Sequence, residues 1–358
     1  RGPPGKRVCN FHMQGKCKNG DSCKYAHCIS LVAKEPAHSA PLKALAALPD
    51  GTFFTGSADN ILNQWSWNPT SCNLQKQGGS VVNGAVQHVE IAENFIVWSM
   101  DANIDQFPGV TVGQVHIMSI SDSPKTFQLQ LSEQKPYAHP MSVLKFIVRV
   151  VDGDLHLITG GVEGVIRVWT LSAATGTVSH LAALEGHIRG VTCMVLQGSI
   201  LWSGSIDRSI CVWDMATMQW VGHITSAAGG HVEEISCMTL VTTPDNGEYV
   251  VSGGLDCYVK VWQPNGDLFY ESEETGIVTA LGTTVDGLDA ILLLVGLSDG
   301  KIIARSWKCL NDLVVIDQTV INHTGEVWSI KSCSSCVVST GGGDGKLIVW
   351  NLQQPLFP

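Results

Sequence analysis

The chain has 358 residues, of which 44% are hydrophobic and 15% are charged, and it contains 37 glycines. This composition provides enough apolar surface for a large core and favours short strands joined by tight turns over long solvated helices. No apolar run approaches the roughly 18 residues that cross a bilayer, and residues 1–28 are polar and basic, so neither a membrane span nor a secretory leader is expected.

Charge divides the chain into two parts. Residues 1–28 contain six lysines or arginines and one acid, Asp21, which gives a net charge of +5. The whole chain carries −10, so residues 29–358 carry −15. A small basic segment joined to a large acidic one indicates that the basic part contacts nucleic acid.

The cysteines point to a reducing environment. Most of the 12 lie singly inside apolar runs, where they are expected to act as small core side chains; examples are Cys193, Cys211, Cys237 and Cys257. Together with the missing leader, this pattern predicts an intracellular protein of the nucleus, the cytoplasm or both.

The first predicted module is a structural zinc site. Its four donors follow the spacing Cys9-x7-Cys17-x5-Cys23-x3-His27. Three thiolates and one imidazole complete the tetrahedral shell that zinc prefers, with no open position for catalysis. A segment this short cannot bury a useful core, so bound Zn²⁺ must supply its folding energy.

The stretch from Cys9 to His27 resembles a CCCH zinc finger. The resemblance implies binding of single-stranded RNA, or otherwise DNA, with bases stacked on Phe11 and Tyr25, which follow the first and third cysteines by two residues. Four neighbouring cations are expected to neutralise phosphates: Arg7, Lys16, Lys18 and Lys24. The alternative is that both aromatic rings only pack around the zinc.

The rest of the chain contains an internal repeat. Alternating runs end at a tryptophan five times, and an acid precedes each tryptophan by six residues: Asp59 and Trp65, Glu163 and Trp169, Asp207 and Trp213, Asp256 and Trp262, Asp344 and Trp350. In two further copies of the repeat, the position of the tryptophan, or slot, is taken by Met118 and Arg305. A period in the mid-forties with four strands per unit is typical of β-propellers, and seven slots predict seven blades.

The repeat resembles the WD repeat. The resemblance implies a buried hydrogen-bond network, and His187, Ser203, Asp207 and Trp213 match it best. Two further histidines give partial matches, His231 with Trp262 and His323 with Trp350. Because buried polar groups are normally paired, these residues are predicted to be structural and not catalytic.

The register of the repeat also predicts how the ring closes. The last predicted blade ends near Leu352 without a fourth strand, whereas residues 29–35 precede the first blade as an unassigned strand. We expect residues 29–35 to pair with the strand around residues 345–350, which would remove two open edges. The predicted fold is therefore all-β, with a CCCH zinc finger at residues 1–28 and a seven-bladed WD-repeat propeller at residues 29–358.

The order of the two modules resembles a plant family that joins a CCCH finger to WD repeats. This resemblance implies a non-enzymatic adaptor, in which the finger contacts nucleic acid and the propeller presents a surface to a protein partner. No nucleophile elbow, phosphate loop or metal-activated water motif is present in the sequence, so no small-molecule substrate is expected.

Two alternatives to the adaptor remain. The first is a pure protein-interaction scaffold, such as a substrate receptor of a ubiquitin ligase, with a structural finger. The second is an enzyme that uses the central channel of the propeller, and the sequence disfavours it because no convergent set of titratable residues is expected outside the repeats.

Overall fold

The computed structural model describes residues 17–18, 29–68, 73–103, 109–120, 123–245, 247–285, 290–310, 313–316, 323–333 and 336–352. The regular secondary structure of these residues is β-strand, apart from one 3-10 helix that spans Ser226–Ala228. No helix in this part of the chain is long and apolar enough to cross a membrane. The all-β prediction is therefore confirmed for the described residues.

The described strands form seven antiparallel sheets of four strands each, numbered here in chain order. Sheet one contains β2 (Leu42–Ala47), β3 (Thr52–Ser57), β4 (Ile61–Asn68) and β5 (Asn73–Val81). Sheet two contains β6 (Ala85–Ala92), β7 (Phe95–Asn103), β8 (Thr111–Ser119) and β9 (Thr126–Gln128). Sheet three contains β10 (Val143–Val151), β11 (Asp154–Gly161), β12 (Val165–Leu171) and β13 (Val178–Glu185).

Sheet four contains β14 (Val191–Gln197), β15 (Ile200–Ser205), β16 (Ile210–Asp214) and β17 (Gln219–Ile224). Sheet five contains β18 (Ile235–Thr242), β19 (Glu248–Gly254), β20 (Tyr258–Trp262) and β21 (Leu268–Glu273). Sheet six contains β22 (Val278–Val285), β23 (Ile291–Leu297), β24 (Ile302–Ser306) and β25 (Leu313–Ile316). Sheet seven contains β26 (Val327–Cys333), β27 (Cys336–Gly341), β28 (Lys346–Leu352) and, from the start of the chain, β1 (Ile29–Pro36).

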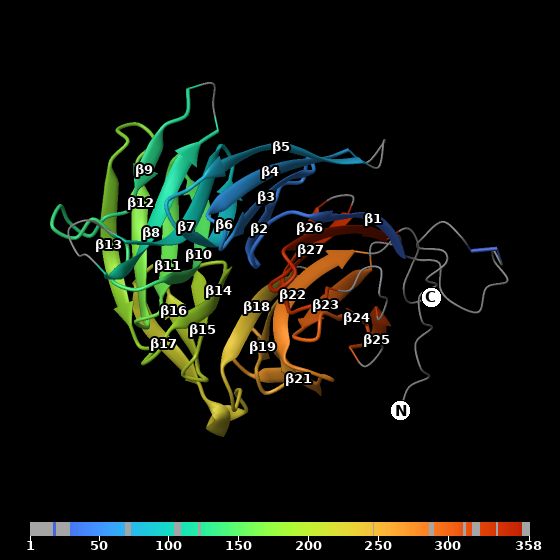
Figure 1. Ribbon diagram of the computed structural model, residues 1–358. Coiled ribbons are helices and arrows are strands. Elements are labelled where there is room, and N and C mark those ends of the chain that lie inside the picture. Colours follow the sequence, from blue (N-terminus) through green and yellow to red (C-terminus); the bar gives the residue numbers. More distant parts are fainter. Residues whose placement is uncertain are drawn as a thin grey trace.

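The sheets are arranged in a ring, as in a β-propeller. The first strand of each sheet contacts the first strands of both neighbouring sheets, and β2 contacts both β6 and β26. In Figure 1 these inner strands lie toward the middle, while the fourth strands lie at the periphery. The ring is therefore continuous through all the described sheets.

Strand β1 completes sheet seven. It pairs antiparallel with β28 from Ile29 opposite Leu352 to Pro36 opposite Lys346. Figure 1 shows the blue β1 beside the red strands that end the propeller. The pairing of residues 29–35 that the repeat register predicts is thus present, and it gives sheet seven a fourth strand from a distant part of the sequence.

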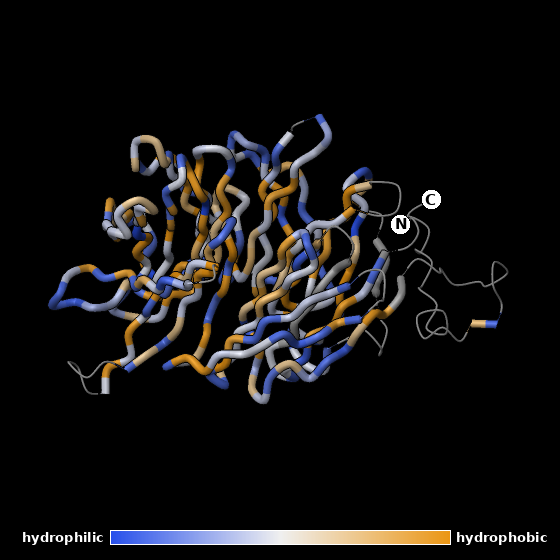
Figure 2. The backbone as a smooth tube through the Cα atoms, turned by 90° about the horizontal axis from the view of Figure 1, so that it is seen from above, coloured by the Kyte–Doolittle hydropathy of each residue, from blue (hydrophilic) through white to orange (hydrophobic). Residues whose placement is uncertain are grey.

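The core lies between neighbouring sheets. At the closure, Leu42, Phe53 and Trp65 of sheet one pack with Leu347 and Val349 of sheet seven. Comparable clusters join sheets one to two, two to three, three to four, four to five, and five to six. In Figure 2 the hydrophobic stretches run along the strands, as expected when both faces of each sheet are covered.

A β-bulge near the start of every inner strand shapes the centre of the ring. In each of the seven strands the register with its partner shifts by one residue at the same place. A bulge leaves one residue out of the ladder and redirects its side chain. The bulged residues line the central cavity described below: Lys43, Gln87, Leu144, Thr192, Ser236, Thr279 and Trp328.

Candidate functional site

The predicted zinc finger lies almost wholly outside the described residues. Of its four predicted ligands, only Cys17 is described, as a half-buried free thiol. Of its predicted nucleic-acid contacts, only Lys18 is described, and it is exposed. The other predicted residues fall outside the described ranges, so their placement stays a prediction: Cys9, Cys23, His27, Phe11, Tyr25, Arg7, Lys16 and Lys24.

The predicted network of sheet four is present and buried. The indole Nε1–H of Trp213 donates to Ser203 Oγ at 2.9 Å, and that oxygen lies 2.8 Å from His187 Nε2. The other ring nitrogen of His187, Nδ1, lies 3.0 Å from the Asp207 carboxylate. One proton arrangement satisfies all three pairs: indole to hydroxyl, hydroxyl to Nε2, and Nδ1–H to carboxylate. Such a fully satisfied chain of hydrogen bonds fixes the two connecting segments that carry His187 and Asp207.

The same chain of hydrogen bonds recurs in three other sheets. The histidine–hydroxyl distances are 2.7–2.9 Å and the indole–hydroxyl distances are 2.8–3.0 Å. Its members are His38, Thr55, Asp59 and Trp65 in sheet one; His139, Thr159, Glu163 and Trp169 in sheet three; His231, Ser252, Asp256 and Trp262 in sheet five. In sheet seven, His323 lies 3.2 Å from Asp344.

The sequence analysis missed His38 and His139. A signal was available, because each network histidine precedes its acid by 20 to 25 residues. In these two sheets the residue before the histidine is not glycine, so the glycine–histidine pattern alone does not identify them.

The acids of the network are held in their charged form. Burial by itself would raise the pKa of Asp207, but hydrogen bonds from His187 and Ser209 and from the Ile188 amide outweigh it and hold the pKa well below its ordinary value. The same balance lowers the pKa of Asp344, with His323 as the main hydrogen-bond partner. A charged carboxylate caps the two turns, as expected for a structural role.

Two sheets depart from the network, as the sequence predicts. In sheet two Met118 lies opposite Ile96, just as Trp213 lies opposite Leu201 in sheet four. In sheet six Arg305 holds the slot opposite Leu293. Arg305 donates to Glu274, which follows the outer strand of sheet five, and both side chains are buried. An ion pair between sheets therefore replaces the tryptophan network there.

A cavity of about 780 Å³ lies at the centre of the ring. Besides the inner strands, its lining includes Leu255, Ile277 and Glu326 from loops. Leu255 directly precedes Asp256, and Glu326 lies three residues after His323, so the cavity reaches the end of the ring that holds the histidine networks.

Charged groups gather in this cavity. Its charged lining residues are three lysines and one acid: Lys43, Lys145, Lys331 and Glu326. No convergent set of titratable residues is expected from the sequence beyond those assigned to the repeat network, and these lysines correct that expectation. Lys43, Lys145 and Lys331 lie on β2, β10 and β26, so only the closed ring brings them together.

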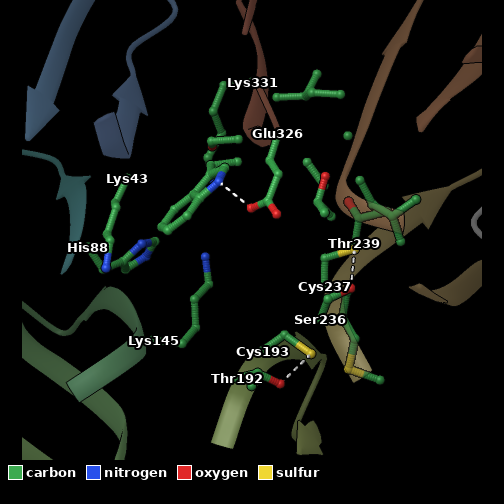
Figure 3. Close-up of a pocket in the computed structure, with 18 of the residues that line it drawn as sticks. Lys43, His88, Lys145, Thr192, Cys193, Ser236, Cys237, Thr239, Glu326 and Lys331 are labelled. Atoms are coloured by element: carbon green, nitrogen blue, oxygen red, sulfur yellow. Dashed lines mark hydrogen bonds between the residues drawn. The ribbon is translucent and has the colours of Figure 1, made fainter. Parts of the chain in front are cut away.

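Near Glu326, the cavity is lined by aromatic and basic groups. Lys43 Nζ donates to Gln87 Oε1 at 3.1 Å and lies 4.9 Å from the centre of the Trp328 ring, a cation–π distance. The indole Nε1–H of Trp328 donates to Glu326 Oε2 at 2.9 Å. Figure 3 shows Lys43, Glu326, Lys145 and Lys331 around the cavity.

Lys145 lies in the same cavity, and its side chain is 24% exposed. Its Nζ lies 4.0 Å from Glu90 Oε1, and the same oxygen lies 3.3 Å from His88 Nε2. Burial, reinforced by the nearby charge of Lys331, lowers the pKa of Lys145 to about 8, against the opposing effect of Glu90. Burial also lowers the pKa of His88 to about 4, so this histidine adds no charge at neutral pH.

Two family models match the chain, one over the predicted finger and one over the predicted repeats. A family model of the zinc finger of the C-x8-C-x5-C-x3-H type, and similar, matches residues 4–29. A model of the WD domain, the G-beta repeat, matches residues 29–66, 178–214, 221–263 and 316–351. The chain thus matches the CCCH zinc finger in its first 29 residues and the WD repeat in four segments of the rest.

Plant proteins of the CCCH type are similar to this chain. Zinc finger CCCH domain-containing protein 59 of Arabidopsis thaliana is 29% identical over 222 residues, which cover 58% of this chain and 40% of that protein. Protein 62 of the same name series from Arabidopsis is 28% identical over 218 residues, 57% of this chain and 45% of its own length. Protein 17 from Oryza sativa subsp. japonica is 25% identical over 216 residues, which cover 57% of this chain and 42% of that protein. The chain thus spans less than half of the length of these relatives.

The WD-repeat matches explain the closure of the ring. The segment 178–214 begins at β13 in sheet three and ends at β16 in sheet four. A WD repeat therefore runs from the outer strand of one sheet to the third strand of the next. With the same offset, the match at 29–66 starts on β1, whose sheet is completed by the last repeat.

The donor set of the CCCH finger fits zinc. Three thiols and one imidazole form a common structural zinc shell, and the match over residues 4–29 includes all four predicted ligands. This chain has seven residues between the first two cysteines, where the name of the family model gives eight. Zinc binding follows from the CCCH finger, and the assignment of each ligand stays a prediction.

Proposed function

We propose that this chain is an adaptor that binds RNA through its zinc finger and a protein partner through its WD-repeat propeller. The observation that carries the proposal is the basic CCCH finger, with a net charge of +5, joined directly to an acidic ring. Cations near an RNA-binding face neutralise phosphates, whereas the acidic ring repels them. The nucleic acid therefore contacts the finger and not the outer surface of the ring.

In the proposed finger, Cys9, Cys17, Cys23 and His27 hold Zn²⁺. Phe11 and Tyr25 stack on bases, and each stacked base contributes about 1–3 kcal/mol to binding. Arg7, Lys16, Lys18 and Lys24 contact phosphates, so the affinity falls as salt rises. A single finger offers few contacts, so the affinity of this module alone is modest.

The propeller supplies a rigid surface for a protein partner. Asp207 and Asp256 fix the backbone amides of Ile188 and Val232 at 3.0 Å each, and both of these side chains remain exposed, at 86% and 57%. They lie at the same position of neighbouring sheets, at the end of the ring that holds the networks. Exposed apolar side chains on a fixed backbone suit a protein interface. We place this adaptor inside the cell, in the nucleus, the cytoplasm or both.

The deciding experiment is crosslinking of RNA to the protein in cells. Wild type is compared with the double variant Phe11→Ala/Tyr25→Ala, and the zinc content of each purified protein is measured. Crosslinking that falls at least about fivefold while zinc stays bound supports stacking on bases. Phe269→Ala is the matched control, because Phe269 is an exposed aromatic on an outer strand of the propeller.

The competing function is a pure protein scaffold, such as a substrate receptor of a ubiquitin ligase, in which the finger is only structural. The exposed Ile188 and Val232 suit either function. Unchanged RNA crosslinking in the double variant with zinc bound would reject the RNA adaptor in favour of the scaffold. A steep fall of RNA affinity between 50 and 200 mM salt, lessened by Lys16→Met/Lys24→Met, would instead support phosphate contacts.

A further inference from the structure

The central cavity differs in charge from the chain around it. The chain as a whole carries −10, whereas the lining of the cavity contains three lysines and one glutamate. The lysines come from sheets one, three and seven. Three like charges in one cavity repel each other unless an anion lies between them.

The acids near these lysines already have hydrogen-bond or ion-pair partners. Glu326 accepts the indole N–H of Trp328, and Glu90 lies beside both His88 and Lys145. Within the described residues, the side chain of Lys331 makes no hydrogen bond or ion pair, but its charge acts on the nearby Lys145 and Glu90. The positive charge of the cavity is therefore only partly compensated by the protein itself.

The opposite wall of the cavity carries no charge. Burial raises the pKa of the Cys193 and Cys237 thiols to about 12, so both remain protonated at neutral pH. Thr239 and Thr283 add hydroxyls to this wall. Figure 3 shows Lys43, His88 and Lys145 on one side and Ser236, Cys237 and Thr239 on the other. A group of negative charge would meet cations on one side and uncharged side chains on the other.

We propose that this cavity binds a small, multiply charged oxyanion of the polyphosphate class, held by Lys43, Lys145 and Lys331. Lys331 and Lys145 pair with one phosphate group, and Lys43, held over the Trp328 ring, pairs with another. The ligand is a bound effector and not a substrate. It is separate from the nucleic acid of the finger.

The size of the cavity favours a small molecule over a polymer. Its volume of about 780 Å³ lies within the range of about 300–1,000 Å³ that is usual for small-ligand sites. Ammonium groups bind phosphates as point charges, and their desolvation in a narrow cavity strengthens the attraction. The site lies between sheets at opposite ends of the sequence, so a bound ligand would also stabilise the closed ring.

The test is calorimetric titration of the zinc-loaded full chain with inorganic pyrophosphate at pH 7, with ionic strength matched by sodium chloride. We expect one site per chain. Lys331→Met should weaken the affinity at least about tenfold, and Lys145→Met/Lys331→Met should abolish measurable binding. Lys76→Met, an exposed lysine on an outer strand, should leave the affinity unchanged.

The finger provides a second arm of the experiment. Because the basic finger could also attract pyrophosphate, Lys16→Met/Lys18→Met is titrated in parallel, and this variant should retain the binding. Lys145 lies 4.0 Å from Glu90, so its substitution could perturb the fold; Lys331→Met alone keeps the test decisive. No binding by wild type, equal binding by Lys331→Met, or loss of binding only in the finger variant would each overturn the proposal. The RNA crosslinking of the Lys331→Met variant should equal that of wild type, which separates this proposal from the function of the finger.

Discussion

The guanidinium Nη2 of Arg305 lies 2.6 Å from Glu274 Oε1, and the two side chains are only 3% and 2% exposed. Arg305 Nε donates to the same oxygen at 2.9 Å. Arg305 holds the slot that tryptophan fills elsewhere, and its partner follows the outer strand of the preceding sheet. A buried ion pair thus links sheets five and six where the hydrogen-bond network is missing.

Removal of one partner of this pair should be costly. Glu274→Ala leaves the Arg305 charge buried with only the Leu310 carbonyl and the Ser272 hydroxyl as acceptors. We expect the free energy of unfolding to fall by about 3–5 kcal/mol, because an unpaired buried charge is strongly unfavourable. Urea denaturation measures the loss.

The double variant Glu274→Leu/Arg305→Met is the control for this prediction. It removes both charges and keeps apolar side chains of similar length, so it should be much more stable than Glu274→Ala. If both variants lose the same free energy, the pair is not what holds the two sheets together.

The hydroxyl of Ser203 joins two buried groups, and its removal should destabilise sheet four. Ser203→Ala leaves the Trp213 indole N–H and the His187 Nε2 without their partner. We expect a loss of about 3 kcal/mol in the free energy of unfolding, since two buried polar groups become unsatisfied. Chemical denaturation followed by tryptophan fluorescence reports it.

Ser203→Thr is the matched variant, because threonine occupies this place in sheets one and three as Thr55 and Thr159. It keeps the hydroxyl and should lose less than half as much stability as Ser203→Ala. Equal losses in both variants would mean that packing, and not hydrogen bonding, determines this position.

Much of the fold follows from the sequence because one pattern repeats. An acid six residues before each tryptophan marks the turn and the third strand of each unit, so the slots locate the sheets, including those of Met118 and Arg305. The unpaired run at residues 29–35 predicts the pairing of β1 with β28 for the same reason. Periodicity is local information, and a propeller is built mostly from local pairings.

The central cavity does not follow from the sequence. No residue type is common to the bulged residues of the seven inner strands, so no pattern marks all of them: Lys43, Gln87, Leu144, Thr192, Ser236, Thr279 and Trp328. Lys43 and Lys331 meet only because the ring closes. The Arg305–Glu274 pair could not be predicted from the sequence for a related reason, since its members lie 31 residues apart in different sheets.

Acid should destabilise the propeller in two stages. Burial lowers the pKa of His116 to about 4, so as pH falls below about 6.5 the unfolded chain binds a proton there before the folded chain does. The pKa of Asp207 is held below its ordinary value, so below about pH 3.8 the unfolded chain again binds protons first. In both windows the folded state binds fewer protons, and stability therefore falls as pH falls.

Urea denaturation at pH 7.5, 5.5, 4.0 and 3.0 measures this dependence. His116→Gln should remove up to about 3 kcal/mol of the decrease between pH 6.5 and 4, the equivalent of its pKa shift. Asp207→Asn should leave that range unchanged and flatten the dependence only below about pH 4. A His116→Gln profile parallel to wild type above pH 4 would show that other groups cause the first stage.

Removal of zinc should leave the propeller closed. Strand β1 pairs with β28 along its whole length, and Val32 and Ala33 pack against the cluster that joins sheets one and seven. These contacts do not involve the proposed ligands, whereas a short finger depends on its metal for folding. After chelation under reducing conditions, we expect fast hydrogen exchange in residues 1–28 and unchanged protection of residues 31–36 and of β28. Cys9→Ser should reproduce this pattern without a chelator and should also abolish RNA crosslinking. If exchange instead rises in β1 and β28 together in both experiments, closure of the ring depends on the metal, and the finger is part of the propeller fold and not a separate module.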